Sequence, residues 1–238
     1  MDKVILIASG KGGTGKTFFA SNMGAVLSER GCRVLLIDMD MGLRSLDLAL
    51  GLESKVIYDI VDVVTGVCKI KQAIIKDKRF NGLYLMSAAQ NPDKGEITVE
   101  NLTGLCEKLR TRFDWIILDC PPGMGQGVCL AASVAEKAIL VTVPEYAAIR
   151  DADTLDRMMI DLGLTDRSYV VNKVNMNLMA GGLIPSLDQI SQILRPKIAG
   201  TIQFDVNIHL AMNNGLPVVS KKGTYIEKNF NNIIDRIL

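Results

Sequence analysis

Two lysines and two threonines lie among glycines near the start of the chain, in the stretch S-G-K-G-G-T-G-K-T of residues 9–17. The apolar run Val4–Ala8 precedes this stretch, and helical spacing follows it from Lys16 to about Glu29. A strand, a glycine-rich loop and a helix N-terminus, in that order, form a site whose backbone N–H groups bind phosphate. The stretch satisfies the pattern G-x-x-x-x-G-K-[ST] and predicts a nucleotide-binding loop made of Gly10, Lys11, Gly12, Gly13, Thr14, Gly15, Lys16, Thr17 and Phe18.

The polar side chains of this loop have separate expected roles. Lys16 is expected to reach the β- and γ-phosphates of a nucleotide, and the Thr17 hydroxyl to ligate Mg²⁺. Lys11 is a second cation that such a loop does not require, and crowding it beside Lys16 is costly unless an anion compensates. We therefore expect Lys11 to contact phosphate, either of its own nucleotide or of one bound by a facing subunit. A solvated lysine is the alternative.

Three aspartates lie at or just after the ends of predicted strands, beside this loop. Asp38 and Asp40 close the run L-L-I-D-M-D, and Asp119 closes the run W-I-I-L-D. Carboxylates two residues apart lie on the same side of an extended chain, where they hold the hydration shell of Mg²⁺ or orient a water. We expect Thr17, Asp38 and Asp119 around the metal and Asp40 at the attacking water. An acidic cluster at a helix start is the alternative for the first two aspartates.

The stretch N-K-V-N of residues 172–175 bears on the choice of base. GTPases use N-K-x-D, whose aspartate reads both guanine N–H groups. Asn175 takes the place of that aspartate and is a weaker guanine selector, whereas Asn172 still offers an amide to a purine edge. The sequence thus favours ATP over GTP.

Short apolar runs alternate with amphipathic stretches along the whole chain. Several runs are nearly continuous Val, Ile and Leu, as expected of strands covered on both faces. The alternation predicts an α/β fold with a doubly wound, mainly parallel sheet, in a single ATP-binding domain over residues 1–238. Strands are expected at Lys3–Ala8, Arg33–Asp38, Leu83–Ser87, Trp115–Asp119, Lys137–Val143, Arg167–Asn172 and Lys197–Ile202. Helices are expected near Thr17–Arg30, Tyr58–Thr65, Thr98–Arg112, Gln126–Ala135, Ala147–Leu162, Ser186–Leu194, Asn207–Asn214 and Thr224–Leu238.

Composition limits the classes of function. The chain has 238 residues, of which 48% are hydrophobic, and a net charge of +1, so it can form a large core and has no bulk attraction for nucleic acid. Five cysteines without a C-x-x-C pair suit a reduced cytosolic protein rather than a disulfide framework or zinc site. We expect no signal peptide and no membrane-spanning run, and we expect the single His209 to be structural.

The loop with its extra lysine, K-G-G-T-G-K-T, resembles the deviant Walker A motif of the MinD/ParA family of P-loop NTPases. The stretch G-L-R-S-L-D-L of residues 42–48 resembles switch I of the MinD branch, and D-C-P-P-G of residues 119–123 resembles switch II of the family. The resemblance implies an ATP-dependent homodimer in which Lys11 reaches the partner's nucleotide. It also implies that Asp40 positions the attacking water and that Asp38 supports the metal.

Further motifs extend the resemblance over nearly the whole chain. The loop G-T-I-Q-F-D of residues 200–205 resembles the family's adenine loop, which adds Gln203 and Asp205 to the expected nucleotide contacts. Phe18 stands where the family has a threonine on the α-phosphate, and Ser45 stands where it has asparagine. A lost neutral hydrogen bond is worth about 0.5–1.5 kcal/mol, so we expect several-fold weaker nucleotide binding. The pattern P-E…R-D-x-D implies an interface with a second copy or a partner at Glu145, Arg150, Asp151 and Asp153.

The resemblance implies a slow ATPase switch that uses ATP and Mg²⁺ in division-site (septum) placement. Its implied partners are a second copy of itself and proteins of the division-inhibitor and ATPase-activator type, with no specific nucleic acid. Its implied location is the cytoplasm, with peripheral contact at the inner face of the cell membrane. Three alternatives stay open: an FlhG-like regulator of flagellar number or placement, a weakly hydrolysing ATP-binding positioning scaffold, and a metal-cluster carrier that uses Cys120 and Cys129.

Two segments are expected to carry no special chemistry. Lys55–Asn81 combines helical spacing with basic residues, for which a solvated face is the default: Lys69, Lys71, Lys76, Lys78 and Arg79. In the last predicted helix the charges cancel and apolar residues recur at helical spacing, so we expect this stripe in the core rather than on a membrane. MinD proteins usually continue into a short basic membrane anchor, which this helix does not resemble.

Overall fold

The structure is a computed structural model that describes residues 3–195 and 197–238. Within them, eight strands form one sheet, in the order β3-β4-β2-β5-β1-β6-β7-β8. All neighbouring strands are parallel except β3 and β4, which confirms the predicted doubly wound, mainly parallel sheet. The strands are β1 (Val4–Ala8), β2 (Val34–Asp38), β3 (Ile74–Lys76), β4 (Leu83–Met86), β5 (Trp115–Asp119), β6 (Lys137–Thr142), β7 (Asp166–Val174) and β8 (Lys197–Gln203).

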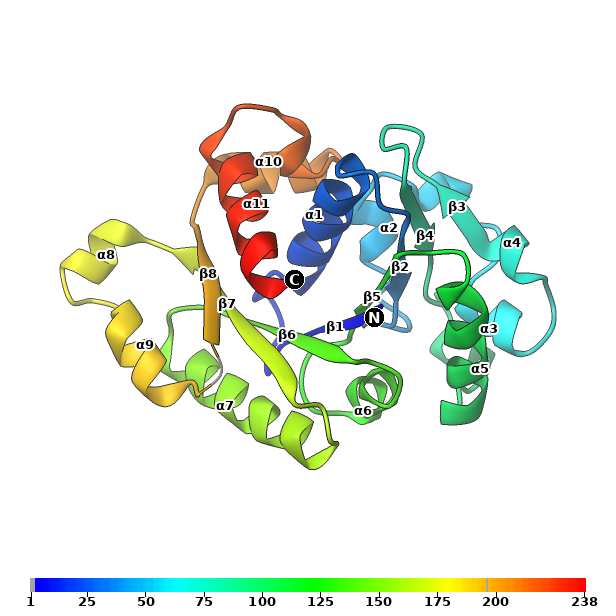
Figure 1. The fold of residues 1–238 in the computed structure, drawn as a ribbon, viewed down its shortest axis with the longest axis horizontal. Helices are drawn as coiled ribbons and strands as arrows, with labels where there is room; N and C mark the ends of the chain where they lie inside the picture. Colours follow the sequence, from blue (N-terminus) through cyan, green and yellow to red (C-terminus); the bar gives the residue numbers. More distant parts are fainter. Residues whose placement is uncertain (1–2, 196) are drawn as a thin grey trace.

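The helices lie on both faces of this sheet (Figure 1). One face is covered by α1 (Lys16–Glu29) and α11 (Tyr225–Ile237). The other face is covered by α3 (Ile60–Val64), α5 (Val99–Arg110), α6 (Gln126–Ala132), α7 (Tyr146–Asp161) and α9 (Leu187–Ile193). The remaining helices are α2 (Leu46–Ala49), α4 (Ile70–Ala73), α8 (Met176–Ala180) and α10 (Val206–Asn213).

Alternate residues of the central strand β1 pack against the two helical layers. Ile5 and Ile7 belong to the core beneath α1 and α11, and Val4, Leu6 and Ala8 belong to the opposite core. The α11 stripe is buried as expected at Ile226, Phe230, Ile233, Ile234 and Ile237, whereas Leu238, expected in the same stripe, is 47% exposed. The rings of Phe18 and Phe19 both lie 5.6 Å from the ring of Phe230, centroid to centroid. These rings fix the helix that follows the glycine-rich loop against the last helix.

The segment Lys55–Asn81 is helical only in part, at α3 and α4, and its five basic residues are exposed as expected. It contains β3, a three-residue strand antiparallel to β4 at the sheet edge, which is too short to produce a recognisable alternation. Arg79, although exposed, is held in place by an ion pair. Its Nη2 lies 2.6 Å from Oδ2 of Asp77, whose side chain is 1% exposed.

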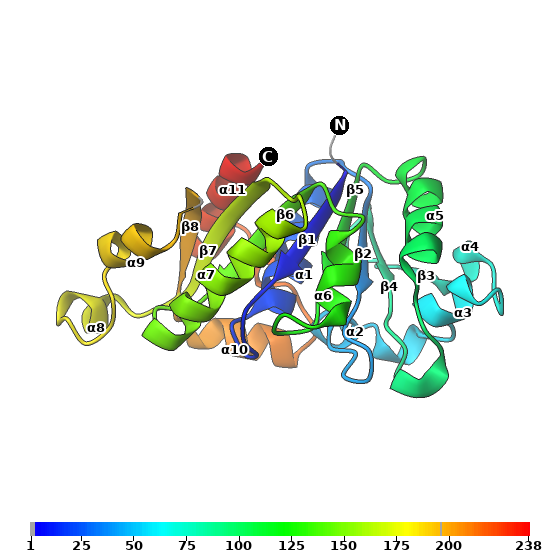
Figure 2. The ribbon, with the colours of Figure 1, turned by 90° about the horizontal axis from the view of Figure 1, so that it is seen from below.

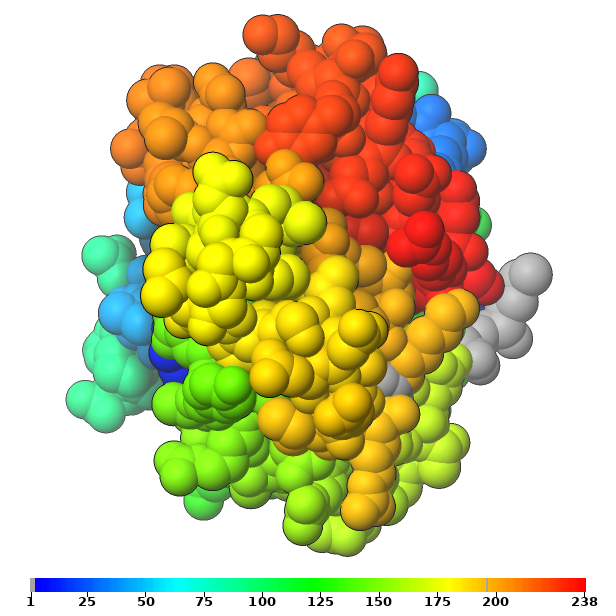
Figure 3. All heavy atoms as spheres, turned by 90° about the vertical axis from the view of Figure 1, so that its left-hand side faces the viewer, coloured from blue at the N-terminus to red at the C-terminus, as the bar shows by residue number. Residues whose placement is uncertain are grey.

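The carboxyl ends of the seven mutually parallel strands meet at one edge of the sheet, where ligands bind in such folds. Figure 2 shows the loop after β1, together with α8 and α10, at this edge. Figure 3 shows α8 and α9 (yellow) on the surface beside β8, between α10 (orange) and α7 (green). Across the described residues, none of the helices is long and apolar enough to cross a bilayer.

Candidate nucleotide-binding and hydrolysis site

The glycine-rich loop joins β1 to α1 in a space that excludes side chains at two positions. A Cβ on Gly10 would lie 2.6 Å from backbone atoms of Asp151 in α7. A Cβ on Gly15, whose φ is +96°, would lie 2.2 Å from Nδ2 of Asn172. Gly10 is therefore required by the close approach of α7, and Gly15 by the neighbouring asparagine and by its left-handed backbone.

Two side chains at the end of β7 hold the loop from the other side. Asn172 Nδ2 donates to the Thr14 carbonyl at 2.8 Å, and Lys173 Nζ donates to the Gly13 carbonyl at 2.7 Å. Asn172 Oδ1 accepts from the backbone N–H of Lys173 at 2.8 Å. The Asn172 amide thus positions the loop, and its contact with a purine stays a prediction. Lys173 was not among the expected site residues, although its place beside Asn172 is the signal that could have found it.

The two lysines of the loop have different surroundings. Lys16 is buried, which lowers the pKa of its ammonium group, while nearby Asp119 and Asp40 act in the opposite direction. Lys11 lies at the surface, with Nζ 2.6 Å from Oε2 of Glu145 at the start of α7. Without nucleotide, an acid rather than solvent alone neutralises Lys11, and its contact with phosphate stays a prediction.

Asp38 organises the segment that follows β2. Its Oδ1 accepts from the backbone N–H of Asp40 and its Oδ2 from that of Leu46, both at 2.9 Å. Burial raises the pKa of Asp38 to about 6. Because both oxygens are already bound, Asp38 supports the site by holding the loop that carries Asp40 in place. Its role at the metal stays a prediction.

Asp119 lies beside Asp38 in the sheet, and its carboxylate needs a bound cation more than the carboxylate of Asp38 does. Its Oδ1 is buried and has no hydrogen-bond partner among the described residues. Burial, reinforced by the neighbouring Asp38, raises the pKa of Asp119 to about 8. A buried carboxylate oxygen without a donor is unfavourable unless a ligand or metal satisfies it.

These donors suit Mg²⁺. The hydroxyl oxygen of Thr17 lies 3.2 Å from that of Ser45, so the expected metal ligand is tied to the segment after β2. Among the described residues, no group of three or more His, Cys, Asp or Glu side chains lies close enough together to hold a metal ion. Mg²⁺ does not need one, because it is usually held by one or two carboxylates, waters and substrate phosphates. Thr17 and Asp119 would hold the metal.

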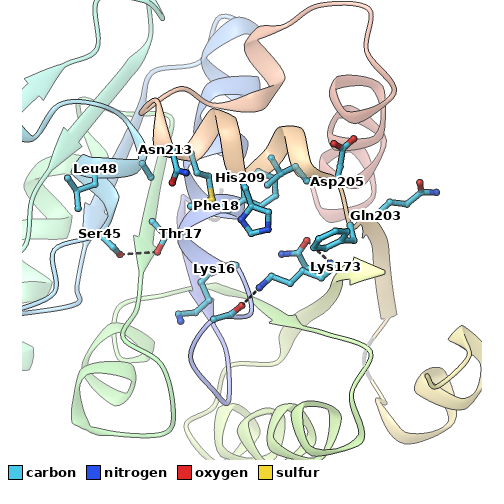
Figure 4. Close-up of a pocket in the computed structure, with 17 residues that line it drawn as sticks. Lys16, Thr17, Phe18, Ser45, Leu48, Lys173, Gln203, Asp205, His209 and Asn213 are labelled. Carbon is cyan, nitrogen blue, oxygen red and sulfur yellow. Dashed lines mark hydrogen bonds between the residues drawn. The ribbon is translucent and has the colours of Figure 1, made fainter. Parts of the chain in front are cut away.

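A cavity of about 460 Å³ extends from the loop toward α10 (Figure 4). Lys16 and Thr17 line one end, and residues around β8 and α10 line the other. Gln203 and Asp205 are among the lining residues, as expected. Asp205 also begins α10, because its carboxylate accepts from the backbone N–H of Asn207 at 2.7 Å and from the Tyr225 hydroxyl at 2.8 Å. Further lining residues are Gly13, Gly15, Phe18, Ser45, Leu48, Ala49, Asn172, Lys173, Phe204, Ile208, His209, Met212 and Asn213.

His209 is exposed on the wall of this cavity (Figure 4), and the expectation that it is structural rather than a ligand or base stays a prediction. Its ring centroid lies 5.9 Å from that of Phe204, and together they form an aromatic wall. No periodicity marks these two residues in the sequence, since they come from a loop and an exposed helix face. Phe18 also borders the cavity, but its ring is 1% exposed and packs in the core.

The residues expected at an interface lie at the N-terminal end of α7 or just before it. Glu145 pairs with Lys11, and Arg150 is largely exposed. Asp151 presents its backbone to Gly10, and Asp153 accepts from Arg157 at 2.7 Å. Cys120, proposed as a cluster ligand in one alternative, is 1% exposed, and burial raises the pKa of its thiol.

Known proteins are similar to this chain in sequence and fold over nearly all of its length. The family profile described as an AAA domain matches residues 2–165. Septum site-determining protein MinD of Bacillus subtilis is 42% identical over 100% of this chain and 90% of its own length. The Thermotoga maritima MinD is 36% identical over 100% of this chain and 88% of its own length.

Two solved structures superpose closely. MinD in the MinC:MinD cell division complex of Aquifex aeolicus has a TM-score of 0.91 and 34% identity, covering 99% of this chain and 95% of that one. MinD of Pyrococcus horikoshii, solved with Mg-ADP, has a TM-score of 0.89 and 26% identity, covering 100% and 96%. Fold and site thus define a P-loop ATPase of the deviant Walker A type. The chain belongs to the MinD family of septum site-determining proteins and acts in division-site placement, which leaves the alternative functions without support.

Proposed function

We propose that this chain, as one domain over residues 1–238, binds ATP with Mg²⁺ and forms a face-to-face dimer that ATP hydrolysis separates. The observation that carries the proposal is the pair of lysines in one loop. Lys16 is buried beneath the loop, and Lys11 lies at its surface. One cation therefore serves the chain's own phosphates, and the other lies where it could exchange Glu145 for the phosphates of a neighbour.

The residues around the phosphates have separate roles in ATP hydrolysis. Lys16 neutralises charge that develops on the β- and γ-phosphates, while Thr17 and Asp119 would hold the metal. When bound, Mg²⁺ would supply further charge stabilisation. Asp40, partly buried and close to Lys16, orients the attacking water. The Asp38 carboxylate fixes the position of Asp40 by accepting a hydrogen bond from the Asp40 backbone N–H.

Exposed apolar side chains in the loops of the carboxyl edge support the dimer. Leu43 follows β2, Met124 follows β5 and Tyr146 follows β6, with exposed fractions of 72%, 42% and 63%. A second copy facing this edge would cover them. The Lys11–Glu145 ion pair lies at the surface, where such pairs are worth about 1 kcal/mol or less, so a triphosphate can replace it.

Light scattering in ADP and in ATP tests this proposal. The wild type should be monomeric with Mg-ADP and double its mass with Mg-ATP. Lys11→Ala should stay monomeric in both, whereas Glu145→Gln should dimerise at least as readily because it releases Lys11. A Lys11→Ala protein that dimerises with ATP and hydrolyses it at the wild-type rate would contradict the proposal.

Partners and membrane contact follow from the family. A division inhibitor, as in the MinC:MinD complex of the Aquifex relative, and an ATPase activator would bind the dimer near Arg150 and Asp153. Peripheral contact at the inner membrane face would not use α11, because its apolar stripe is buried. Co-sedimentation with anionic liposomes in ATP and in ADP tests this contact. Retention in the pellet only with ATP supports it, and equal amounts in both argue against it.

A further inference from the structure

The wall of the nucleotide cavity opposite the loop is built from two helices far apart in sequence. α2 contributes Leu48 and Ala49, and α10 contributes Ile208, His209 and Met212. None of the α10 residues is buried. Ile208 and Met212 pack α10 against the core while only partly buried, so contacts at the helix ends also help to set the distance between the two helices.

Arg79, from the segment between β3 and β4, joins those ends. Its Nη2 donates to the carbonyl of Leu50, directly after α2, and its Nη1 donates to the carbonyl of Gly215, just after α10, at 2.8 Å. The carboxylate of Asp77 holds the same guanidinium, with Nε 3.0 Å from Oδ1 and Nη2 2.6 Å from Oδ2. Arg79 is thereby fixed on one side and bridges two carbonyls on the other.

The two helix ends also meet directly. A Cβ on Gly215 would lie 2.4 Å from Cα of Gly51, and a Cβ on Gly51 would lie 3.1 Å from the carbonyl oxygen of Gly215. Both glycines have positive φ, of 60° and 57°. The contact is thus backbone to backbone, and the Arg79 fork spans it.

We propose that Arg79 is a positioning residue that sets the width of the nucleotide cavity by fastening α2 to α10. The inference rests on the proposed function, because the cavity must be the ATP site. Loosening the junction would widen the adenosine end and leave the phosphate end, at Lys16 and Thr17, in place. A small displacement of a wall far from the reacting atoms is enough to weaken substrate binding.

The conservative variant Arg79→Lys tests this best, because it keeps a cation beside the buried Asp77 but lacks the planar fork that spans two carbonyls. Isothermal titration calorimetry in the presence of Mg²⁺ should show that Arg79→Lys binds ATP and ADP about five-fold more weakly than the wild type. Its binding of inorganic tripolyphosphate should be unchanged. That factor corresponds to one lost hydrogen bond of about 1 kcal/mol. The steady-state KM should rise by a similar factor while kcat is retained.

Arg30→Lys is the matched control. Arg30 also bridges two elements, with Nη1 2.7 Å from Oδ1 of Asp235 and Nη2 3.1 Å from the carbonyl of Asn231, both in α11. The Arg30→Lys substitution should lower the midpoint temperature of thermal unfolding without changing ATP affinity. Equal ATP affinity in Arg79→Lys and wild type, or equal losses for ATP and tripolyphosphate, would overturn the inference. A wild type that fails to bind ATP would instead overturn the proposed function, and this inference with it.

Discussion

At the scale of single residues, the site is built by burying charges that the fold alone does not satisfy. Asp119 ends β5 with an oxygen that lacks a donor among the residues that the structure describes, and Lys16 is buried at the start of α1. Both groups are disfavoured in their charged forms until ligands arrive, since desolvation penalises an isolated charge. Mg²⁺ and a triphosphate supply the missing countercharges.

This burial predicts a pH dependence of the nucleotide-free protein. Below the ordinary carboxyl pKa of 3.8, Asp38 and Asp119 are protonated in both folded and unfolded chains and contribute nothing. Above it the unfolded chain loses protons that the folded chain retains, so their contribution to stability falls until pH passes the raised values of about 6 and about 8. Thermal unfolding without Mg²⁺ from about pH 5.5 to about pH 8.5 should show a smaller fall for Asp119→Asn than for the wild type. Equal falls would mean that Asp119 is already ionised in the folded chain.

The aromatic wall makes a second prediction at this scale. His209→Ala removes a ring that a purine base can stack on, which should weaken ATP binding about five-fold, for a loss of about 1 kcal/mol. His209→Phe keeps the ring and should bind nearly as tightly as the wild type. Competition titration with a fluorescent ATP analogue measures both. Unchanged affinity in His209→Ala would remove this side chain from the base site.

At the scale of elements, the loop and α7 are in direct contact, and one glycine permits it. Gly10→Ala would bring a Cβ to 2.6 Å from the Asp151 backbone, so loop or helix must move. We expect a loss of about 1–3 kcal/mol, as for other overpacking substitutions. In Gly12→Ala the nearest atom would be Cβ of Pro122 at 4.0 Å, so the nucleotide-free protein should keep its stability. Chemical denaturation of the two variants without nucleotide compares them, and equal losses would show that the close approach does not matter.

The elements that the sequence predicts and those that it does not differ for physical reasons. Buried parallel strands such as β1 and β5 are long apolar runs, so both strands and their terminal aspartates could be predicted. β3 is a three-residue edge strand without a pattern of its own. From the sequence, Arg79 was interpreted as one of several surface cations. Its partners are the backbone carbonyls of Leu50 and Gly215, and contacts to backbone carbonyls cannot be predicted from residue types. Phe204, and the place of His209 on the cavity wall, were not predicted because exposed cavity walls carry no periodicity.

At the scale of the whole molecule, the parallel sheet brings residues from Lys11 to Asn213 to one edge. Loops after β1, β2, β5, β7 and β8 all contribute, so the phosphate, metal and base ends of the site come from separate parts of the chain. The same edge exposes Lys11 and the apolar residues that a second copy would cover. In the proposed dimer, one surface would respond to both nucleotide state and assembly, which is what a division-site switch requires.

The most direct test of this account is phosphate release by wild type and Asp40→Ala, with bound ATP measured in the same samples. Asp40 is assigned to the attacking water and not to nucleotide binding. Asp40→Ala should therefore bind Mg-ATP about as tightly as wild type and remain dimeric, with phosphate release reduced by about 10²-fold or more, as when a general base or water-orienting group is removed. Wild-type phosphate release from ATP-bound Asp40→Ala would contradict the account.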